Sequence, residues 1–491
     1  MPAGFLAFDL GASSGRALLG EMSGDRLAVR ELHRFPNGII EIAGHLHWDL
    51  FRLLEHVKSG LRACAVDAGI RPESVGIDTW GVDFGLLDEK GQVLGLPFAY
   101  RDSRTRGAME SFFSRLPRER VYELTGIQLL ELNSLFQLES MVRDGSPLLS
   151  RAQDLLFMPD LFHYLLADVR AAEFTFATTS QMYNPTNGGW DSEILGALGL
   201  PESLMQDVVQ PGTVLGAIGP KIGAETGLGK VPLVAVATHD TGSAIAAVPA
   251  EGRGWAYISS GTWSLMGIES DRPIITDRTR DLNITNEGGV GRTFRVLKNI
   301  SGLWLVQECR RAWASETDLS YAELTAAAGE AEPFGSLLDP DHPDFMSPDD
   351  MPQAIADYCR RTGQAAPDTR GAYVRCILDS LALKYRFVLD QLRQISEHDI
   401  DRIHIIGGGS QNELLCRLTA DATGLDVLAG PVEATAIGNL LVQAMAVGRI
   451  DSLEELRQVV RSSFESVAYR PRHTKEWEAA YGRFSELLEQ G

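Results

Sequence analysis

The chain contains the segment Gly407-Gly408-Gly409-Ser410-Gln411-Asn412, which is its most informative indication of fold. It follows a short, mainly apolar stretch, 403–406, that we predict to be a strand, and it opens an amphipathic helix. Two further segments follow at ordered spacing: Ala420-Asp421-Ala422-Thr423-Gly424 and Pro431-Val432-Glu433-Ala434-Thr435-Ala436-Ile437-Gly438. Because glycines have no side chain, they let the backbone approach a flat, charged ligand. The stretch therefore predicts a nucleotide site at a strand-to-helix turn.

A tight hairpin with a turn of small residues is predicted twice. The first joins strands 5–10 and 16–22 through Gly11-Ala12-Ser13-Ser14-Gly15, and a third strand is expected at 27–35. The second hairpin joins 255–258 and 263–268 through Ser259-Ser260-Gly261-Thr262. Such turns expose successive backbone N–H groups that can bind phosphate oxygens. Two ordinary hairpins are the alternative, since Gly and Ser are common turn residues. Together with the glycine-rich turn, the repeat indicates two related halves facing a shared nucleotide cleft.

Length, charge and cysteine content limit the possible classes of protein. A chain of 491 residues is too long for one core, so we expect two large domains. The net charge of -21 argues against binding nucleic acid or an anionic membrane surface. No membrane span or secretory leader is expected, so the predicted location is cytoplasmic. The five cysteines lack CxxC spacing; Cys359 and Cys376 could pair, but reduced thiols are the simpler interpretation.

The coarse pattern between these motifs is mixed α/β. We predict a helix after Trp48-Asp49, a hairpin joining 82–87 to 92–96, a buried strand at 231–237 and a core helix over 374–392. Residues 331–370 are predicted to form an irregular surface excursion. Pro249-Ala250-Glu251-Gly252-Arg253-Gly254, rich in breakers, is the expected boundary between a domain of residues 1–248 and one of residues 249–491.

Two carboxylates are candidates for phosphoryl-transfer chemistry. Asp9 ends the first strand and could organise Mg²⁺ beside the phosphates; its alternative is to cap the turn. Asp240 follows the buried strand in Thr238-His239-Asp240-Thr241-Gly242, at the end of a strand where α/β proteins bind ligands. It could accept the proton of an attacking hydroxyl, or it could be a helix N-cap, or both. The glycine-rich loop and Lys of P-loop enzymes are absent, so ATP would have to be bound by the hairpin turns.

Two polar clusters could bind a sugar. Trp80-Gly81-Val82-Asp83 combines an aromatic ring, a glycine and a carboxylate, and Arg101-Asp102-Ser103-Arg104 follows a predicted strand. For each cluster, an ordinary surface turn or ion pair is the alternative, and such a pair would contribute little to stability.

Taken together, these motifs resemble the FGGY family of carbohydrate kinases over nearly the whole chain. Beyond the adenosine signature at 407–438, the resemblance rests on segments 8–16, 76–84, 99–105, 239–241, 259–267, 286–289 and 296–307. It implies an actin-like ATPase fold, in which two RNase H-like domains flank a nucleotide and sugar cleft. The first domain would carry the sugar site, the first phosphate hairpin and the catalytic base. The second would carry the other hairpin and the adenosine motif.

The resemblance also implies a role for each matching residue. Asp240 would be the catalytic base and also contact the sugar, and Asp9 would organise the metal, Mg²⁺. ATP would be bound by Ala12, Ser13, Ser14, Gly15, Arg16, Thr262, Gln307 and Gly408. The other sugar contacts would be Gly81, His239, Thr241 and Asn299.

The implied reaction transfers the γ-phosphoryl group of ATP to O1 of a small ketose. The Trp80 turn, the Arg101 cluster and the Lys298-Asn299 segment favour L-rhamnulose. Another ketose or polyol, such as L-fuculose or D-xylulose, is the alternative substrate. An actin-like ATPase without kinase activity and a catalytically dead sugar sensor are the alternative functions. A monomer is compatible with the sequence, which leaves the oligomeric state open.

Overall fold

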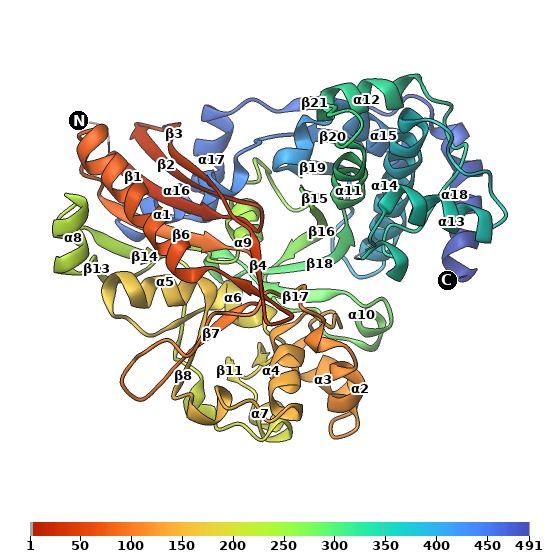
Figure 1. Ribbon diagram of the computed structural model, residues 1–491. Helices are drawn as coiled ribbons and strands as arrows, with labels where there is room; N and C mark the ends of the chain where they lie inside the picture. Colours follow the sequence, from red (N-terminus) through yellow and green to blue (C-terminus); the bar gives the residue numbers. More distant parts are fainter. Residues whose placement is uncertain (1–2, 347, 491) are drawn as a thin grey trace. The chain divides into compact units, whose positions relative to one another are not determined.

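The computed structural model describes residues 3–346 and 348–490, which form two compact units (Figure 1). Unit 1 comprises Met1–Pro249, Glu269–Val296 and Ala434–Ser463. Unit 2 comprises Ala250–Ile268, Leu297–Glu433 and Phe464–Gly491. The chain first changes unit after Pro249, within the predicted boundary segment, but two later segments belong to unit 1 rather than to unit 2. The compact units differ from the predicted domains 1–248 and 249–491, and that division of the chain stays a prediction.

Unit 1 is built on a sheet whose first three strands are antiparallel neighbours. The strand order is β13-β14-β6-β1-β2-β3. Parallel pairing joins β1 to β6 and β6 to β14, and β13 pairs with β14 in antiparallel orientation. The bounds are β1 Ala3–Leu10, β2 Ser14–Ser23, β3 Arg26–Pro36, β6 Ser74–Thr79, β13 Thr213–Ala217 and β14 Pro232–Ala235. The strands predicted at 5–10, 16–22 and 27–35 are confirmed, and the strand predicted at 231–237 is shorter.

Helices cover both faces of this sheet. On one face, α1 (Leu50–Arg62) packs so closely that a Cβ on Gly60 would lie 2.5 Å from the ring of Phe8. On the other face, α16 (Ala434–Ala446) lies against β1 and β6, and a Cβ on Gly76 would lie 2.6 Å from Asn439. Residues 4–10 of β1 are all buried, and successive residues of a strand point to opposite faces, so both faces of β1 are covered. Helix α1 begins where predicted, because the Asp49 carboxylate caps the N–H of Arg52.

The predicted hairpin between 82–87 and 92–96 is only partly right. The turn exists, because the N–H of Asp88 donates to the carbonyl of Gln92 at 2.9 Å. The regular partner of β7 (Phe84–Leu87), however, is β8 (Asp154–Phe157). Strand β8 is buried along its length, whereas residues 92–96 are exposed or only half-buried, so β8 offers the larger buried apolar surface.

The remaining elements of unit 1 are short. They are β4 Ile39–Ile42, β5 His45–Trp48, α2 Ala108–Phe113, α3 Arg118–Thr125, α4 Ser134–Arg143, α5 Met158–Ala167, β9 Ala172–Glu173, α6 Phe174–Thr179, β10 Tyr183–Asn184, β11 Gly189–Trp190, α7 Ser192–Leu198, β12 Val208–Val209, α8 Pro220–Thr226, α9 Asp240–Ala246, α10 Asp277–Asp281, β17 Thr285–Gly288 and α17 Leu453–Ser463.

Unit 2 contains strands in the order β18-β16-β15-β19-β20-β21. The central strands β15, β19 and β20 are parallel, and β16 and β21 are antiparallel to their neighbours β15 and β20. The chain passes from unit 1 into unit 2 within β18. The bounds are β15 Trp255–Ser260, β16 Trp263–Ser270, β18 Phe294–Ser301, β19 Arg402–Ile406, β20 Asp426–Ala429 and β21 Val467–Tyr469. The second predicted hairpin, β15 with β16, is confirmed.

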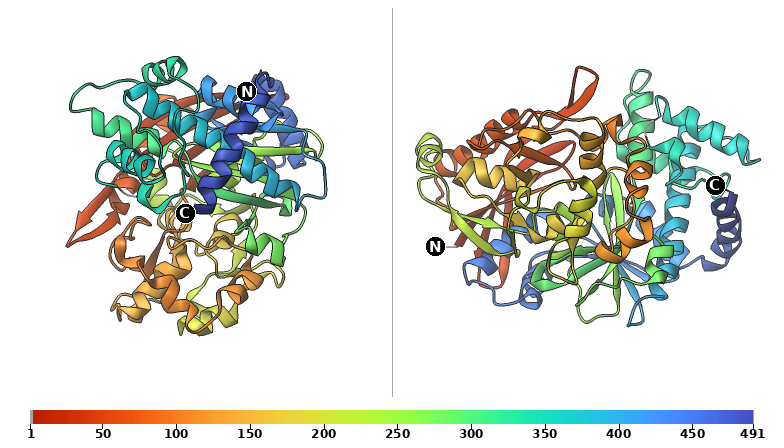
Figure 2. Two further views of the ribbon diagram at one scale, coloured as in Figure 1. Left: turned by 90° about the vertical axis from the view of Figure 1, so that its right-hand side faces the viewer. Right: turned by 90° about the horizontal axis from the view of Figure 1, so that it is seen from below.

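Within residues 3–346 and 348–490, unit 2 contains six α-helices: α11 Trp304–Trp313, α12 Tyr321–Glu330, α13 Met351–Arg361, α14 Arg370–Arg393, α15 Glu413–Thr423 and α18 Thr474–Gln490. The core helix predicted over 374–392 is confirmed as α14, which packs against α12, α15 and the long C-terminal helix α18 (Figure 2). The prediction of an irregular excursion over 331–370 is wrong, because α13 buries Ile355 and Tyr358. Their helical spacing is masked in the sequence by charged neighbours.

The structure describes all five cysteines as buried free thiols, as the simpler interpretation expected. Among the described residues, no helix is long and apolar enough to cross a membrane.

Candidate active site

The strongest candidate for a catalytic base lies where β14 gives way to α9 in unit 1. The chain leaves β14 buried, and His239 forms a parallel bridge with Thr79 at the end of β6. Asp240 is the first residue of α9, and about a third of its side chain (32%) is exposed. Its Oδ1 accepts from the N–H of Thr241 at 2.5 Å and from the Thr241 hydroxyl at 3.1 Å. His239, not Asp240, occupies the N-cap position, so the capping alternative is wrong.

The environment of Asp240 suits a proton acceptor. Burial raises the pKa of Asp240, the nearby charge of Asp9 raises it further, and His239 opposes the shift. A carboxylate whose pKa moves toward neutral accepts a proton more readily while staying largely ionised. Within the residues described, Oδ2 accepts no hydrogen bond, so it is open to a substrate hydroxyl.

Gly81 lies beside the same residues. It follows Trp80 after β6, and a Cβ at position 81 would lie 3.1 Å from Nε2 of His239. A larger residue there would fill the space in front of the imidazole. The structure thus brings together four of the five predicted sugar contacts, namely Gly81, His239, Asp240 and Thr241.

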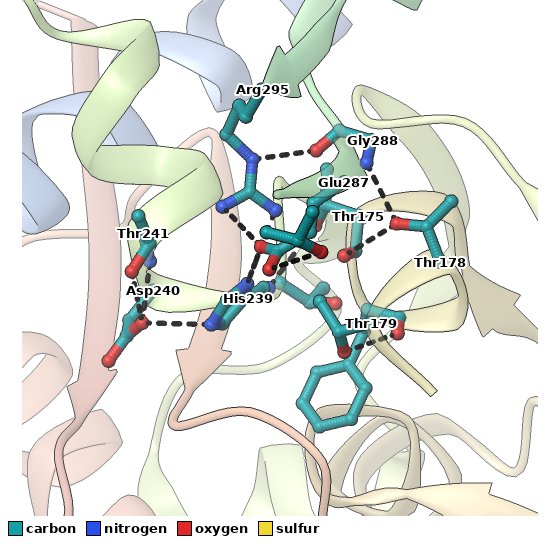
Figure 3. Close-up of polar contacts among 12 residues, drawn as sticks. Thr175, Thr178, Thr179, His239, Asp240, Thr241, Glu287, Gly288 and Arg295 are labelled. Carbon is teal, nitrogen blue, oxygen red and sulfur yellow. Dashed lines mark hydrogen bonds and ion pairs between the residues drawn. The ribbon is translucent and has the colours of Figure 1, made fainter. Parts of the chain in front are cut away.

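Behind His239 lies a buried polar network, shown in Figure 3. Nδ1 of the imidazole is 3.2 Å from Nη2 of Arg295 and 3.5 Å from Oε2 of Glu287. Arg295 and Glu287 form an ion pair at 3.1 Å, and Nε of Arg295 donates to the carbonyl of Gly288 at 2.8 Å. On the other side, Nε2 of His239 is 3.5 Å from Oδ1 of Asp240. The imidazole therefore links a buried ion pair to the candidate base.

Asp9 lies in a row of charged residues across three strands. Its register partners are Arg16 on β2 and Asp78 on β6, and Nη2 of Arg16 is 2.5 Å from Oδ2 of Asp9. Asp78 is fully buried and accepts from Nδ2 of Asn439 at 2.5 Å. Burial and the charge of Asp9 raise the pKa of Asp78 well above its usual range. Because the Asp9 carboxylate pairs with Arg16, its alternative role as a turn cap is not the one observed.

The turn of the first hairpin is held rigidly. The N–H of Gly11 donates to the carbonyl of Ser14 at 2.9 Å. Asn37 donates from its backbone to Ser13 at 3.0 Å and from Nδ2 to Gly11 at 2.8 Å. Gly15 is required by packing, because a Cβ there would lie 2.2 Å from the ring of Phe35. Ala12, Ser13, Ser14 and Arg16 remain at least partly exposed, as a phosphate-binding turn requires.

The hairpin turn of unit 2 is braced by the start of α11. The carbonyl of Thr262 accepts from the N–H groups of Gly302 and Trp304, both at 3.1 Å. The Thr262 hydroxyl donates to Oε1 of Gln307 at 3.2 Å. The two predicted nucleotide contacts Thr262 and Gln307 are therefore in direct contact.

The three glycines that follow β19 differ in their surroundings. Gly407 has a φ of 81°, which favours glycine, and a Cβ on Gly409 would lie 2.0 Å from Oγ of Ser260. A Cβ on Gly408 would meet no heavy atom of the described chain within 4 Å. The backbone conformation favours glycine at 407 and packing requires it at 409, whereas the described chain leaves space around Gly408. Gly438, at the end of the same signature, belongs to unit 1.

The comparisons with known proteins cover nearly the whole chain. Models of the FGGY family of carbohydrate kinases match residues 5–247 (N-terminal domain) and 256–447 (C-terminal domain). A rhamnulokinase of Bacteroides thetaiotaomicron is 49% identical over 99% of this chain and 100% of its own length. A rhamnulokinase of Pectobacterium carotovorum is 44% identical over 98% of this chain and 96% of its own length.

The chain belongs to the FGGY family of carbohydrate kinases. Two solved structures share its fold at low sequence identity. Xylulose kinase from Lactobacillus acidophilus superposes with a TM-score of 0.82 at 13% identity, over 99% of this chain and 98% of the other. Glycerol kinase from Plasmodium falciparum with ADP superposes with a TM-score of 0.80 at 12% identity, over 100% of this chain and 98% of the other. The predicted fold class, two actin-like ATPase domains of mixed α/β type, is confirmed.

In this FGGY kinase, Trp80 and Asp83 do not form the sugar-binding pair considered from the sequence. Asp83 is fully buried and accepts from the indoles of Trp48 at 2.6 Å and Trp80 at 2.9 Å, and from Gln137 at 2.9 Å. Burial raises the pKa of Asp83 to about 6. The carboxylate and the Trp80 ring are therefore parts of the core, neither a sugar-binding pair nor a surface turn.

The Arg101 cluster is structural in the same way. Arg104 donates to the carbonyl of Gln137 at 2.8 Å and to Oγ of Ser140 at 2.9 Å. The buried Asp102 carboxylate accepts from the N–H of Leu46 at 2.7 Å. Both side chains connect a loop to its surroundings, and Nε of Arg104 lies 3.9 Å from Oδ1 of Asp102, so the ion pair considered as the alternative is present but is buried rather than on the surface.

Asn299, the fifth predicted sugar contact, lies on β18 within unit 2 and is half-buried. It is thus in a different unit from Gly81 and His239. Its neighbour Lys298 has a pKa lowered to about 8, mainly by burial.

A divalent metal fits unit 1 through a single carboxylate. Among the described residues, no group of three His, Cys, Asp or Glu side chains could hold a metal ion. Mg²⁺ commonly binds through one or two carboxylates, several waters and the substrate's phosphates. Asp9, whose side chain is 12% exposed and whose Oδ2 pairs with Arg16, suits that mode.

The sequence alone predicts no role for Arg295, Glu287 or Asn37. Glu287 lies in one of the segments that carried the resemblance, but a role could not be inferred for it there. A signal for Arg295 was available: it is a lone cation in the otherwise apolar run Phe294–Leu297. Such a residue in a buried strand needs a partner.

Proposed function

We propose that this FGGY kinase phosphorylates L-rhamnulose at O1 with ATP, giving L-rhamnulose 1-phosphate and ADP, in L-rhamnose breakdown. The observation that carries the chemistry is Asp240, a partly exposed carboxylate with a raised pKa beside Gly81 and His239. The curated relatives that support the sugar are named rhamnulokinases and are 40–49% identical over nearly the full length.

The proposed chemistry begins at Asp240. Thr241 holds Oδ1 through two hydrogen bonds, and this leaves Oδ2 to accept the proton of O1. As that proton moves, O1 forms a bond to the γ-phosphorus, the bond from the γ-phosphorus to the bridging oxygen breaks, and ADP leaves with the electron pair. Fixing the carboxylate rotamer lowers the entropy cost of reaching this arrangement.

The nucleotide is assigned to two groups of residues. In unit 1 the turn from Ala12 to Gly15 exposes backbone N–H groups, and Arg16 adds a positive charge. In unit 2 the candidates are Thr262, Gln307 and the open backbone at Gly408. Backbone N–H groups in these turns would bind phosphate oxygens and so offset part of the repulsion between ATP and a chain of net charge -21.

Mg²⁺ is the metal in this proposal, and Asp9 is the residue that would hold it, through water or directly. When bound, it would neutralise negative charge on the phosphate oxygens. The proposal places the enzyme in the cytoplasm, because five buried free thiols suit a reducing compartment.

The experiment is ADP release by the purified protein with Mg-ATP and a panel of L-rhamnulose, L-fuculose, D-xylulose, L-ribulose and glycerol. We expect the rate of ADP release with L-rhamnulose to be far higher than with the other compounds. Preference for a different sugar would refute the substrate and keep the kinase chemistry. Slow hydrolysis that no sugar accelerates would refute both.

A further inference from the structure

The buried ion pair Glu287–Arg295 has no part in the chemistry so far. Arg295 is fully buried and Glu287 is 4% exposed. Their closest atoms, Nη1 and Oε2, form an ion pair at 3.1 Å, and among the described residues neither atom makes a hydrogen bond of ordinary geometry. Replacing a buried ion pair by apolar residues often leaves stability unchanged or improves it, so stability alone is a weak reason for this pair. Its position directly behind His239 offers a better reason (Figure 3).

Arg295 determines which nitrogen of His239 carries hydrogen. A guanidinium can only donate hydrogen bonds, and Nη2 is 3.2 Å from Nδ1 of His239. Nδ1 can therefore accept only with its lone pair, and the ring hydrogen must sit on Nε2. The opposite tautomer could donate from Nδ1 to Oε2 of Glu287 at 3.5 Å, but it would then place two N–H donors, Nδ1 and Nη2 of Arg295, against each other at 3.2 Å.

The hydrogen on Nε2 points toward the base. Nε2 is 3.5 Å from Oδ1 of Asp240, slightly long for a hydrogen bond, as is common before substrate binds. With the hydrogen on Nε2, the imidazole attracts the carboxylate and can also donate to a sugar oxygen. In the opposite tautomer, Nε2 would carry a lone pair and no hydrogen, and the imidazole would repel the ionised Asp240 carboxylate. One tautomer supports the base and the other opposes it.

Glu287 makes the buried arginine tolerable. A lone guanidinium without a counter-charge would be costly to bury. The charge of Arg295 lowers the pKa of Glu287 against the effect of burial, so the carboxylate stays ionised. The strand that carries Glu287 is itself fixed, because the N–H of Gly288 donates to Oγ1 of Thr178 at 2.8 Å.

Resting on the proposed function of Asp240, we propose that Arg295 and Glu287 are positioning residues that hold His239 in its Nε2–H tautomer, facing the base and the sugar. The groups that face the imidazole come from four elements. They are Asp240 on α9, Glu287 on β17, Arg295 on β18 and the ring of Phe176 on α6; on the same helix the Thr175 hydroxyl accepts from the backbone N–H of His239 at 3.2 Å. Only Asp240, Glu287 and Arg295 among these are ionisable.

The direct test is ¹⁵N NMR of the histidine side chains in the full-length protein without substrate. The two tautomers differ in which ring nitrogen carries hydrogen, and the His239 signal is assigned as the one lost in His239→Gln. We expect Nε2–H in the wild type and in Arg295→Lys, which keeps a donating cation. In Arg295→Gln, whose amide can also accept, we expect a mixture of tautomers. Finding Nδ1–H in the wild type, or the same tautomer in Arg295→Gln, would overturn the proposal.

Kinetics supply the second readout. Arg295→Gln and Glu287→Gln should lower kcat for the preferred ketose by about 10²-fold, the effect of misplacing a catalytic group by about 1 Å. KM for ATP should stay unchanged, because the predicted nucleotide contacts do not include these residues. Arg295→Lys should recover much of kcat. If all three variants only lower the unfolding midpoint and keep kcat, the pair is merely structural and the proposal fails.

The two proposals fail in different ways. The tautomer measurement needs neither ATP nor a sugar, so it stands even if the preferred substrate is not L-rhamnulose. Conversely, a wild-type enzyme that phosphorylates L-rhamnulose while His239 carries its hydrogen on Nδ1 would keep the function and remove the role of Arg295.

Discussion

Replacing Gly438 by alanine should disturb the catalytic base from a distance. Gly438 lies on α16, and an added Cβ would sit 1.8 Å from the carbonyl oxygen of Ser243 on α9. Real Cβ atoms essentially never approach closer than 3.0 Å, so the two helices must separate by about 1.2 Å. Ser243 is one turn after Asp240, so a shift of α9 carries the base with it.

We expect α9 rather than α16 to move. Helix α16 is tied to the sheet by Asn439, which donates to Asp78 at 2.5 Å. Gln443 on the same helix accepts from Ser74 at 2.8 Å and donates to the carbonyl of Leu6 at 3.1 Å. Overpacking of this kind costs about 1–3 kcal/mol of stability, and a displacement of about 1 Å costs roughly 10²-fold in rate.

The assay is kcat for ADP release at saturating ATP and sugar, together with a thermal unfolding curve. Gly482→Ala on α18 is the matched control, because its Cβ would meet no described atom within 4 Å. That change should leave kcat unaltered and stabilise the protein by about 0.5–1 kcal/mol. If Gly438→Ala keeps wild-type kcat and an unchanged unfolding midpoint, the rigidity assumed between α9 and α16 is refuted.

Three further predictions follow from the site and its surroundings. Asp240→Asn should lower kcat by about 10²–10⁴-fold while sugar binding measured by calorimetry persists; near-normal turnover would exclude Asp240 as the base. Gly408→Ala should raise KM for ATP without loss of stability, whereas Gly409→Ala should lower stability by about 1–3 kcal/mol because of its contact with Ser260; equal unfolding midpoints would contradict this. For Asp83, the folded-state pKa of about 6 exceeds the unfolded value of about 3.8, so its protonation favours the folded state. Its contribution to stability is full below about pH 3.8 and is lost as pH rises to about 6, by roughly 3 kcal/mol in all. The difference in unfolding free energy between the wild type and Asp83→Asn should follow that curve, and a flat difference would refute the shift.

The local features of this protein could be predicted from its sequence. The hairpins around Gly11–Gly15 and Ser259–Thr262, the helix beginning after Asp49 and the buried helix α14 all depend on residues close together in the chain. The placement of Asp240 at the end of a strand also follows from local pattern, because an apolar run ending in Thr-His-Asp leaves the acid at the strand's exit. Turn residues, caps and periodicity act over a few residues, so they leave a readable signature.

Only the tertiary structure decided what lies beside these features. Helix α16 belongs to unit 1, where Asn439 and Gln443 form hydrogen bonds with Asp78 and Ser74, more than 350 positions earlier in the chain. The sequence around α16 does not predict these contacts. Asp83 looked like a sugar ligand, but two indoles and Gln137 bury it. The contact of Arg295 on β18 with His239 at the start of α9 depends on how the sheet and helices pack. Contacts between distant residues depend on the whole set of packing energies, which no single segment contains.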